Sequence, residues 1–141
     1  MSEHALIRRR DAAQAVLDRF ADNPHAWGSY DCGQMLLTQL RGVDHTVKLA
    51  GVGTYKTMIG AKRALRRLGY PSLTAYMDAH YPRIPPAFAI VGDVIALPSV
   101  GPLDAIGICL GNGRAIAYHE SAVGAVVVQP IEMLAAWRVD P

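Results

Sequence analysis

Apolar residues in the first half of the chain recur every three or four positions, the spacing of amphipathic helices. The first helix predicted in this way ends at Asn23-Pro24. Asp31 is a good N-cap for the second, with Gln34 three residues later as in a capping box. The predicted helices cover residues 4–22, Cys32 to about Arg41, 58–68, and a short segment that holds Leu73 and Met77.

β-Branched residues and glycines mark the second half of the chain as strands. Gly111-Asn112-Gly113 predicts a tight hairpin, because these residues tolerate a positive φ. The proline-bearing stretch 81–86 predicts irregular structure, and Pro130 predicts a last short helix that runs through Trp137. The predicted strands are Asp93–Leu97, Ala105–Leu110, Arg114–Tyr118 and Ala125–Gln129. Helices followed by a small antiparallel sheet define an α+β fold.

Composition agrees with one folded domain over residues 1–141. The chain has 141 residues, of which 51% are hydrophobic and 18% charged, enough to fill a core and too apolar for a disordered segment. No uncharged apolar run is long enough to cross a membrane. An Asp-containing amphipathic segment follows Arg8-Arg9-Arg10, so we expect no signal peptide and synthesis in the cytoplasm.

Positive charge gathers in the first half of the chain, although the net charge is only +2. Residues 1–70 hold eleven basic and six acidic residues, whereas 71–141 hold three and six. The outer face of the third helix predicts a basic surface formed by Lys62, Arg63, Arg66 and Arg67. This surface suits solvent, phosphates or an acidic partner protein. Because no nucleic-acid motif accompanies it, we expect no nucleic-acid partner; such binding would weaken steeply with salt.

Cys32 is the first candidate for chemistry. It occupies the predicted first residue of a helix, where the macrodipole and free N–H groups favour a thiolate. The alternative is a small buried apolar residue. Cys32 and Cys109 are too few for a disulfide scaffold and lack the spacing of a zinc site, so we expect neither a metal nor a cofactor.

Three motifs occur in order: Asp-Cys-Gly at residues 31–33, Gly-Asp-Val at 92–94, and Ile-Gly-Ile-Cys-Leu-Gly-Asn-Gly at 106–113. Together they resemble the NlpC-type cell-wall peptidases, which implies a compact papain-like fold. A closer likeness is to small proteins encoded among bacteriophage tail genes. It rests on four features in chain order: the Trp27-Gly28 and Asp31-Cys32 pairs, the segment Gly53–Gly69, Gly92-Asp93-Val94, and the closing Ala136-Trp137-Arg138-Val139. This likeness implies a place in the virion tail, beside hub, distal tail or tape-measure proteins.

The chain departs from the active peptidases at the catalytic base. By the resemblance, imidazoles belong at Ala105 and at about Ala117, and a methyl group neither accepts nor donates a proton. A slip of two residues would place His119 on the same face as Ala117, as a displaced base. His25 and His45, both expected in loops, are two further candidates for the base, and the Asp104 carboxylate is a poor base at neutral pH.

We therefore expect a structural or assembly component of a phage tail tip or baseplate, with Cys32 as a vestigial nucleophile. The expected groove lies around Cys32, Trp27, Tyr30 and Asp31, with Ala105 and Ala117 in place of the imidazoles, and it holds a segment of a neighbouring tail protein. The alternative is an active cysteine peptidase or amidase that cleaves peptidoglycan peptides during phage entry.

Overall fold

The computed structural model describes residues 3–44, 47, 54–99, 104–118 and 124–140. Helices precede strands along the chain, which confirms the α+β class. All four helices predicted in the first half are present, with boundaries within about three residues of those expected. They are α1 (Glu3–Phe20), α2 (Cys32–Val43), α3 (Met58–Arg67) and α4 (Leu73–His80).

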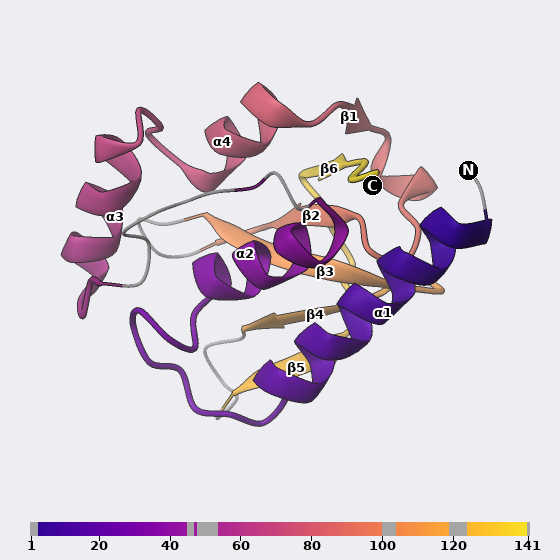
Figure 1. Ribbon diagram of the computed structural model, residues 1–141, viewed down its shortest axis with the longest axis horizontal. Helices are drawn as coiled ribbons and strands as arrows, with labels where there is room; N and C mark the ends of the chain where they lie inside the picture. The colour runs from indigo at the N-terminus through magenta and orange to yellow at the C-terminus, as the bar shows by residue number, and fades with distance from the viewer. Residues whose placement is uncertain (1–2, 45–46, 48–53, 100–103, 119–123, 141) are drawn as a thin grey trace.

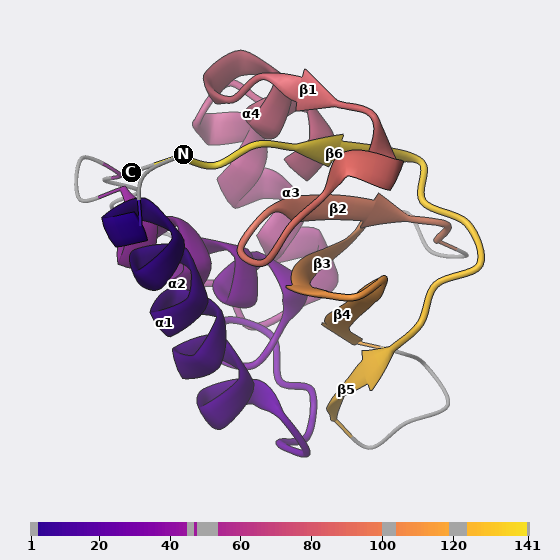
Figure 2. The same cartoon turned by 90° about the vertical axis from the view of Figure 1, so that its right-hand side faces the viewer.

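The described strands form one antiparallel sheet in the order β1-β6-β2-β3-β4-β5. Helices α1 and α2 cover one of its faces, and the segment that joins β5 to β6 passes the side away from them (Figures 1 and 2). A 3-10 turn at Pro86–Phe88 precedes β2. The strands are β1 (Arg83–Ile84), β2 (Val94–Leu97), β3 (Ala105–Gly111), β4 (Arg114–Tyr118), β5 (Ala125–Val128) and β6 (Ala135–Trp137).

The main core lies between the helices and the sheet. Phe20 of α1 and Met35 of α2 are fully buried against Ile106 and Ile108 of β3. A smaller cluster on the other face contains Ile95. Because successive strand residues point to opposite faces, both faces require apolar residues, and this requirement accounts for the nearly unbroken apolar run of β3.

The prediction of a helix after Pro130 is wrong. That segment forms no helix and ends in β6, which lies between β1 and β2. Ile131 and Leu134 of the expected helical stripe are exposed, whereas Ala136 and Trp137 are buried in clusters on opposite faces of the sheet. Pairing with two neighbouring strands overrides the helical spacing.

The proline-bearing stretch also differs from the prediction, because it contains strand β1. This strand has two residues and pairs with β6 at the edge of the sheet, where proline neighbours are tolerated. The predicted hairpin between β3 and β4 is confirmed. Gly111, Asn112 and Gly113 have φ values of +92°, +56° and +73°, and a register shift accompanies the turn.

Asp93 of the Gly-Asp motif belongs to a buried ionic cluster. It pairs with Arg9 of α1, and neither side chain has any exposed surface. Arg138 Nε donates to both carboxylate oxygens at 3.1 Å. Arg9 also donates to the carbonyls of Val91, at 3.0 Å, and Val139. This cluster joins the N-terminal helix to the C-terminal segment, so the motif has a structural role.

The crossing of α1 and α2 depends on Gly42. A Cβ atom at this position would lie 2.7 Å from the Cβ of Ala12, closer than packed carbons approach. We expect Gly42→Ala to lower the free energy of unfolding by about 1–3 kcal/mol, because the helices must separate. In an Ala12→Gly background the same change should be stabilising, since alanine has the better helix propensity. Urea unfolding of the four proteins measures this coupling, and equal effects in both backgrounds would contradict it.

Candidate functional site

Asp31 caps the helix that carries Cys32, as predicted. Its backbone is extended (φ −134°), and its Oδ1 accepts a hydrogen bond of 2.8 Å from the Gln34 backbone N–H. The Gln34 side chain does not close the expected capping box; its amide donates to the Tyr55 hydroxyl at 3.3 Å. The cap therefore fixes the start of α2 at Cys32 and ties it to the segment before α3.

The second Asp31 oxygen has two further donors. Oδ2 accepts from the Gly28 N–H and from the Tyr55 hydroxyl, both at 2.8 Å. Only 1% of Asp31 is exposed. This buried carboxylate thus has three hydrogen-bond donors, as a buried charge requires. Tyr55 was not among the candidate residues, although it lies within the segment Gly53–Gly69 that carries the phage-tail likeness.

The Cys32 thiol lies against the start of β3. Its Sγ is 3.9 Å from the Asp104 carbonyl oxygen. The thiolate expected at the helix terminus is not favoured overall: burial, followed by the Asp31 charge, raises the pKa of Cys32 to about 12. The backbone N–H groups of Ile106 and Cys32 oppose this rise and are outweighed. Asp31 already places a negative charge at the terminus, and burial penalises a second one.

Ala105 and Ala117 lie in β3 and β4, the strands expected for them, but the structure does not bring Ala117 to the Cys32 side of the sheet. Asp104, whose carbonyl contacts the thiol, immediately precedes Ala105 at the start of β3. Ala117 is buried in β4 opposite Val126 of β5. Strand alternation puts Ala117 on the same side as Ala115, which belongs to the smaller cluster away from the helices. Neither position supplies a proton-transfer group.

The Asp104 carboxylate forms its hydrogen bonds with α4 and not with the thiol. That group accepts hydrogen bonds from the backbone N–H of Leu73, at 3.2 Å, and from the N–H and hydroxyl of Thr74, both at 2.6 Å. Its charge contributes to raising the pKa of Cys32. The side chain therefore anchors the first turn of α4 to the start of β3, which is a structural role.

Among the described residues, no imidazole forms a hydrogen bond with the Cys32 thiol. His25 is exposed, and its ring packs edge-on against Trp27, with centroids 4.5 Å apart, and against Tyr118, at 5.3 Å. The expectations for His119 and His45 lie outside the described residues. The described site therefore holds a partly buried thiol without a base.

Tyr118 is a site residue that the sequence reasoning missed. Burial, followed by the charges of Asp31 and Cys32, raises its pKa. Its hydroxyl oxygen is buried and has no hydrogen-bond partner within the part of the chain that the structure describes. The available signal was strand alternation, which puts Tyr118 on the helix side of β4, opposite to Ala117. Tyr30, in contrast, packs edge-on against Phe20, with centroids 5.8 Å apart.

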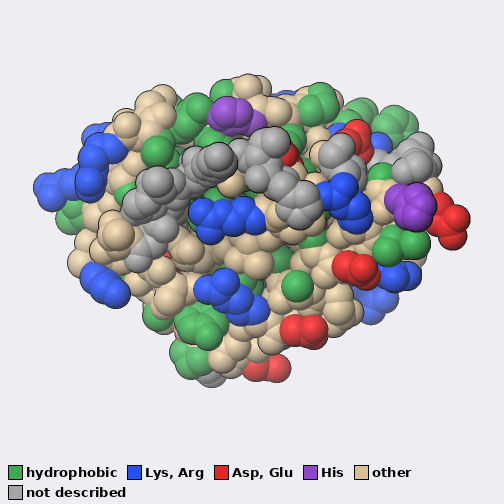
Figure 3. All heavy atoms as spheres, in the orientation of Figure 1, with side chains coloured by type: hydrophobic (Ala, Val, Ile, Leu, Met, Phe, Trp, Pro, Cys, Tyr) green, Lys and Arg blue, Asp and Glu red, His purple; other side chains and the backbone are tan. Residues whose placement is uncertain are grey.

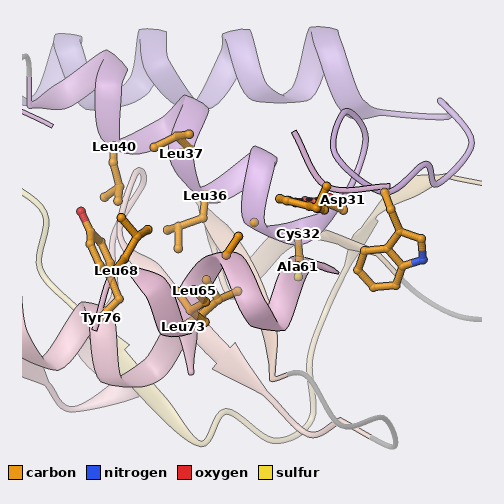
Figure 4. A pocket seen from close by; sticks show the side chains of 14 residues that line it. Asp31, Cys32, Leu36, Leu37, Leu40, Ala61, Leu65, Leu68, Leu73 and Tyr76 are labelled. Atoms are coloured by element: carbon orange, nitrogen blue, oxygen red, sulfur yellow. Dashed lines mark hydrogen bonds between the residues drawn. The ribbon is translucent and has the colours of Figure 1, made fainter. Parts of the chain in front are cut away.

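An apolar cavity of about 60 Å³ extends from Cys32 between α2 and α3 (Figure 4). Trp27 and Asp31 line it together with Cys32, so the structure brings together three of the predicted groove residues. Tyr30, Ala105 and Ala117 do not line it. The helices contribute mainly aliphatic side chains, namely Leu36, Leu37 and Leu40 from α2 and Ala61, Ala64 and Leu65 from α3.

The predicted basic residues lie on α3. Arg63, Arg66 and Arg67 are exposed and Lys62 is half-buried. Figure 3 shows blue side chains over the end of the molecule that α3 occupies in Figure 1. The ion pairs found among the described residues involve none of these four side chains.

The described residues contain neither a cluster of metal-ligating side chains nor a membrane-spanning helix. No group of three or more His, Cys, Asp or Glu side chains there could hold a metal ion. No described helix combines the length and apolar character needed to span a membrane.

The fold and site define an α+β protein with a partly buried thiol at the capped start of α2, next to the first residue of a central strand. The family model for a domain of unknown function, DUF6950, matches residues 6–139, and the chain belongs to this family. No curated protein matches the chain.

Proposed function

We propose that this protein is a non-catalytic structural or assembly component of a phage tail tip or baseplate, built on an NlpC-type papain-like fold. The observation that supports a non-catalytic role is the protonated Cys32 thiol without a described base. This thiol has a pKa of about 12 and forms no hydrogen bond with a described imidazole. Cysteine catalysis requires a thiolate and an acid that protonates the leaving group.

The order of elements supports the papain-like part of the proposal. A cysteine begins a helix that packs against the sheet, and its sulfur lies at the start of β3, which leads into a hairpin and β4. This is the arrangement that the sequence likeness implies. The tail role rests on the likeness to proteins encoded among phage tail genes, with hub, distal tail or tape-measure proteins as partners.

Particle composition tests the tail role. In phage particles purified from a host that expresses the complete tail gene cluster, quantitative mass spectrometry should find this chain at a fixed ratio to the other tail proteins. A Cys32→Ala phage should yield the same number of infective particles as the wild type. Absence of the chain from both particles and tail-assembly intermediates would contradict the role, and a loss of infectivity in the Cys32→Ala phage would contradict the non-catalytic part.

The rival function is an active cysteine peptidase or amidase, which the position of Cys32 at the helix start favours. Purified protein incubated with peptidoglycan peptides should release no product above the level of its Cys32→Ala variant. Turnover that disappears in Cys32→Ala and in His119→Ala would establish the rival function, with His119 as the displaced base.

A further inference from the structure

Helix α3 is less completely packed against the rest of the protein than the other three helices. Each of the other three helices contains fully buried side chains, whereas α3 has none. The small side chains Ala61 and Ala64 face the leucines of α2. The cavity beside Cys32 results from this mismatch, since protein interiors normally contain few voids larger than a water molecule.

The size and lining of the cavity limit what can enter it. Its volume of about 60 Å³ is less than half of the roughly 150 Å³ that holds benzene in an engineered apolar cavity. An aromatic ring is therefore too large. Apolar cavities stay dry, because water finds too few hydrogen-bond partners in them. The end of one aliphatic side chain fits both the volume and the lining.

The polar groups at the Cys32 end favour the same kind of occupant. The Asp31 carboxylate is already satisfied by Gly28, Gln34 and Tyr55. The Cys32 thiol stays protonated at neutral pH, because its pKa is raised. Neither group is available to compensate the desolvation of a polar or charged ligand atom, so the inserted group is apolar.

The outer surface of α3 adds a charge requirement. Residues 45–77 contain six lysines and arginines and no aspartate or glutamate. Among the described residues, Arg63, Arg66 and Arg67 are exposed on α3, and no ion pair involves them. A partner that approaches this helix gains from carboxylates, which steer the encounter and set specificity.

We infer that the α2–α3 cavity and the basic face of α3 form one docking site for an acidic peptide segment of a partner protein. The segment inserts a single aliphatic side chain next to Cys32 and places its carboxylates against Arg63, Arg66 and Arg67. This inference rests on the proposed function, since it specifies the chemistry of the segment that a tail partner would present.

The test uses an array of fluorescent nonapeptides made of glutamate and serine, with leucine, isoleucine, methionine or serine at the centre. Fluorescence anisotropy with the full chain should detect binding of the peptides with an aliphatic centre. The serine peptide should bind about ten- to a hundredfold more weakly, because it buries no aliphatic side chain. Replacement of glutamate by lysine in the leucine peptide should abolish binding.

Two variants examine the two halves of the site. Ala64→Leu fills the cavity from α3. It should raise the melting temperature and weaken binding of the leucine peptide at least tenfold. Ala79→Leu, at an exposed position of α4, is the matched control and should leave binding unchanged. Arg63→Glu with Arg67→Glu should also weaken binding at least tenfold, whereas Arg114→Glu, an exposed arginine at the hairpin, should not.

Three results would overturn the inference: no binding of any aliphatic peptide, binding that Ala64→Leu leaves intact in a folded protein, or equally tight binding of single-stranded DNA or anionic vesicles. These results concern the docking site alone. The tail role is tested separately by particle composition, so a chain that is present in particles but does not bind the peptides would refute only this inference.

Discussion

At pH 7.5 we expect Cys32 to react with iodoacetamide about a thousandfold more slowly than the same cysteine in the unfolded chain. The thiolate is the reactive species, and folding raises the pKa of this thiol from its ordinary value of 9.0 to about 12. Three pKa units correspond to a factor of about a thousand in the thiolate fraction. Mass spectrometry of the peptide that contains Cys32, over a time course, measures the rate.

Both the alkylation rate of Cys32 and the stability of the protein should change with pH in a direction set by the raised pKa. Because the folded pKa lies above the unfolded one, the alkylation rate should rise about tenfold per pH unit well beyond pH 9 while the protein stays folded. Between pH 9 and 12 the unfolded chain binds fewer protons at this site than the folded chain, so stability falls as the pH rises through that window. Cys32→Ala should remove the part of this fall in stability that comes from the thiol.

The Cys109→Ala variant isolates the signal of Cys32 and should give the same rate. A rate at pH 7.5 equal to or above that of the unfolded chain would contradict the expectation. It would mean that a positive charge or a base stabilises the thiolate, as in a working peptidase, and His119→Ala would then show whether His119 supplies it.

The helix-start position of Cys32 was readable from the sequence, but its chemical consequence was not. Asp31 was recognised as the N-cap, and an N-cap carboxylate both occupies free N–H groups and brings a negative charge next to the sulfur. The burial that contributes most to the raised pKa comes from packing against distant parts of the chain, such as the start of β3. Local spacing does not encode such contacts.

The fold was predictable where local signals and packing agree. The Asp31 cap and the hairpin turn were both read from neighbouring residues. The prediction for the segment that ends in Trp137 is wrong because the apolar residues of that segment fit a helical stripe. Its pairing with β1 and β2 requires a strand instead. The partner of Asp93 was equally hidden, because Arg9 lies 84 residues away.

The second large effect concerns the buried ionic cluster. We expect Asp93→Asn to lower the free energy of unfolding by about 3–5 kcal/mol, because the fully buried Arg9 guanidinium loses its buried counter-charge and keeps only the exposed Asp140 carboxylate at 3.5 Å. The asparagine amide keeps nearly the same shape, so the loss reports charge and hydrogen bonding more than packing. Urea unfolding followed through the fluorescence of the buried Trp137 measures the shift in midpoint.

Arg10→Ala is the matched control, because Arg10 and Asp11 form an ion pair in which both side chains are about two-thirds exposed, at 67% and 65%. This variant should change the free energy of unfolding by less than about 1 kcal/mol. An unchanged midpoint for Asp93→Asn would mean that the carbonyls of Val91 and Val139, with the Asp140 carboxylate, are enough to hold the Arg9 guanidinium. A large loss of stability in both Asp93→Asn and Arg10→Ala would mean that α1 as a whole is sensitive to change, because Arg9, the partner of Asp93, and Arg10 are adjacent on that helix.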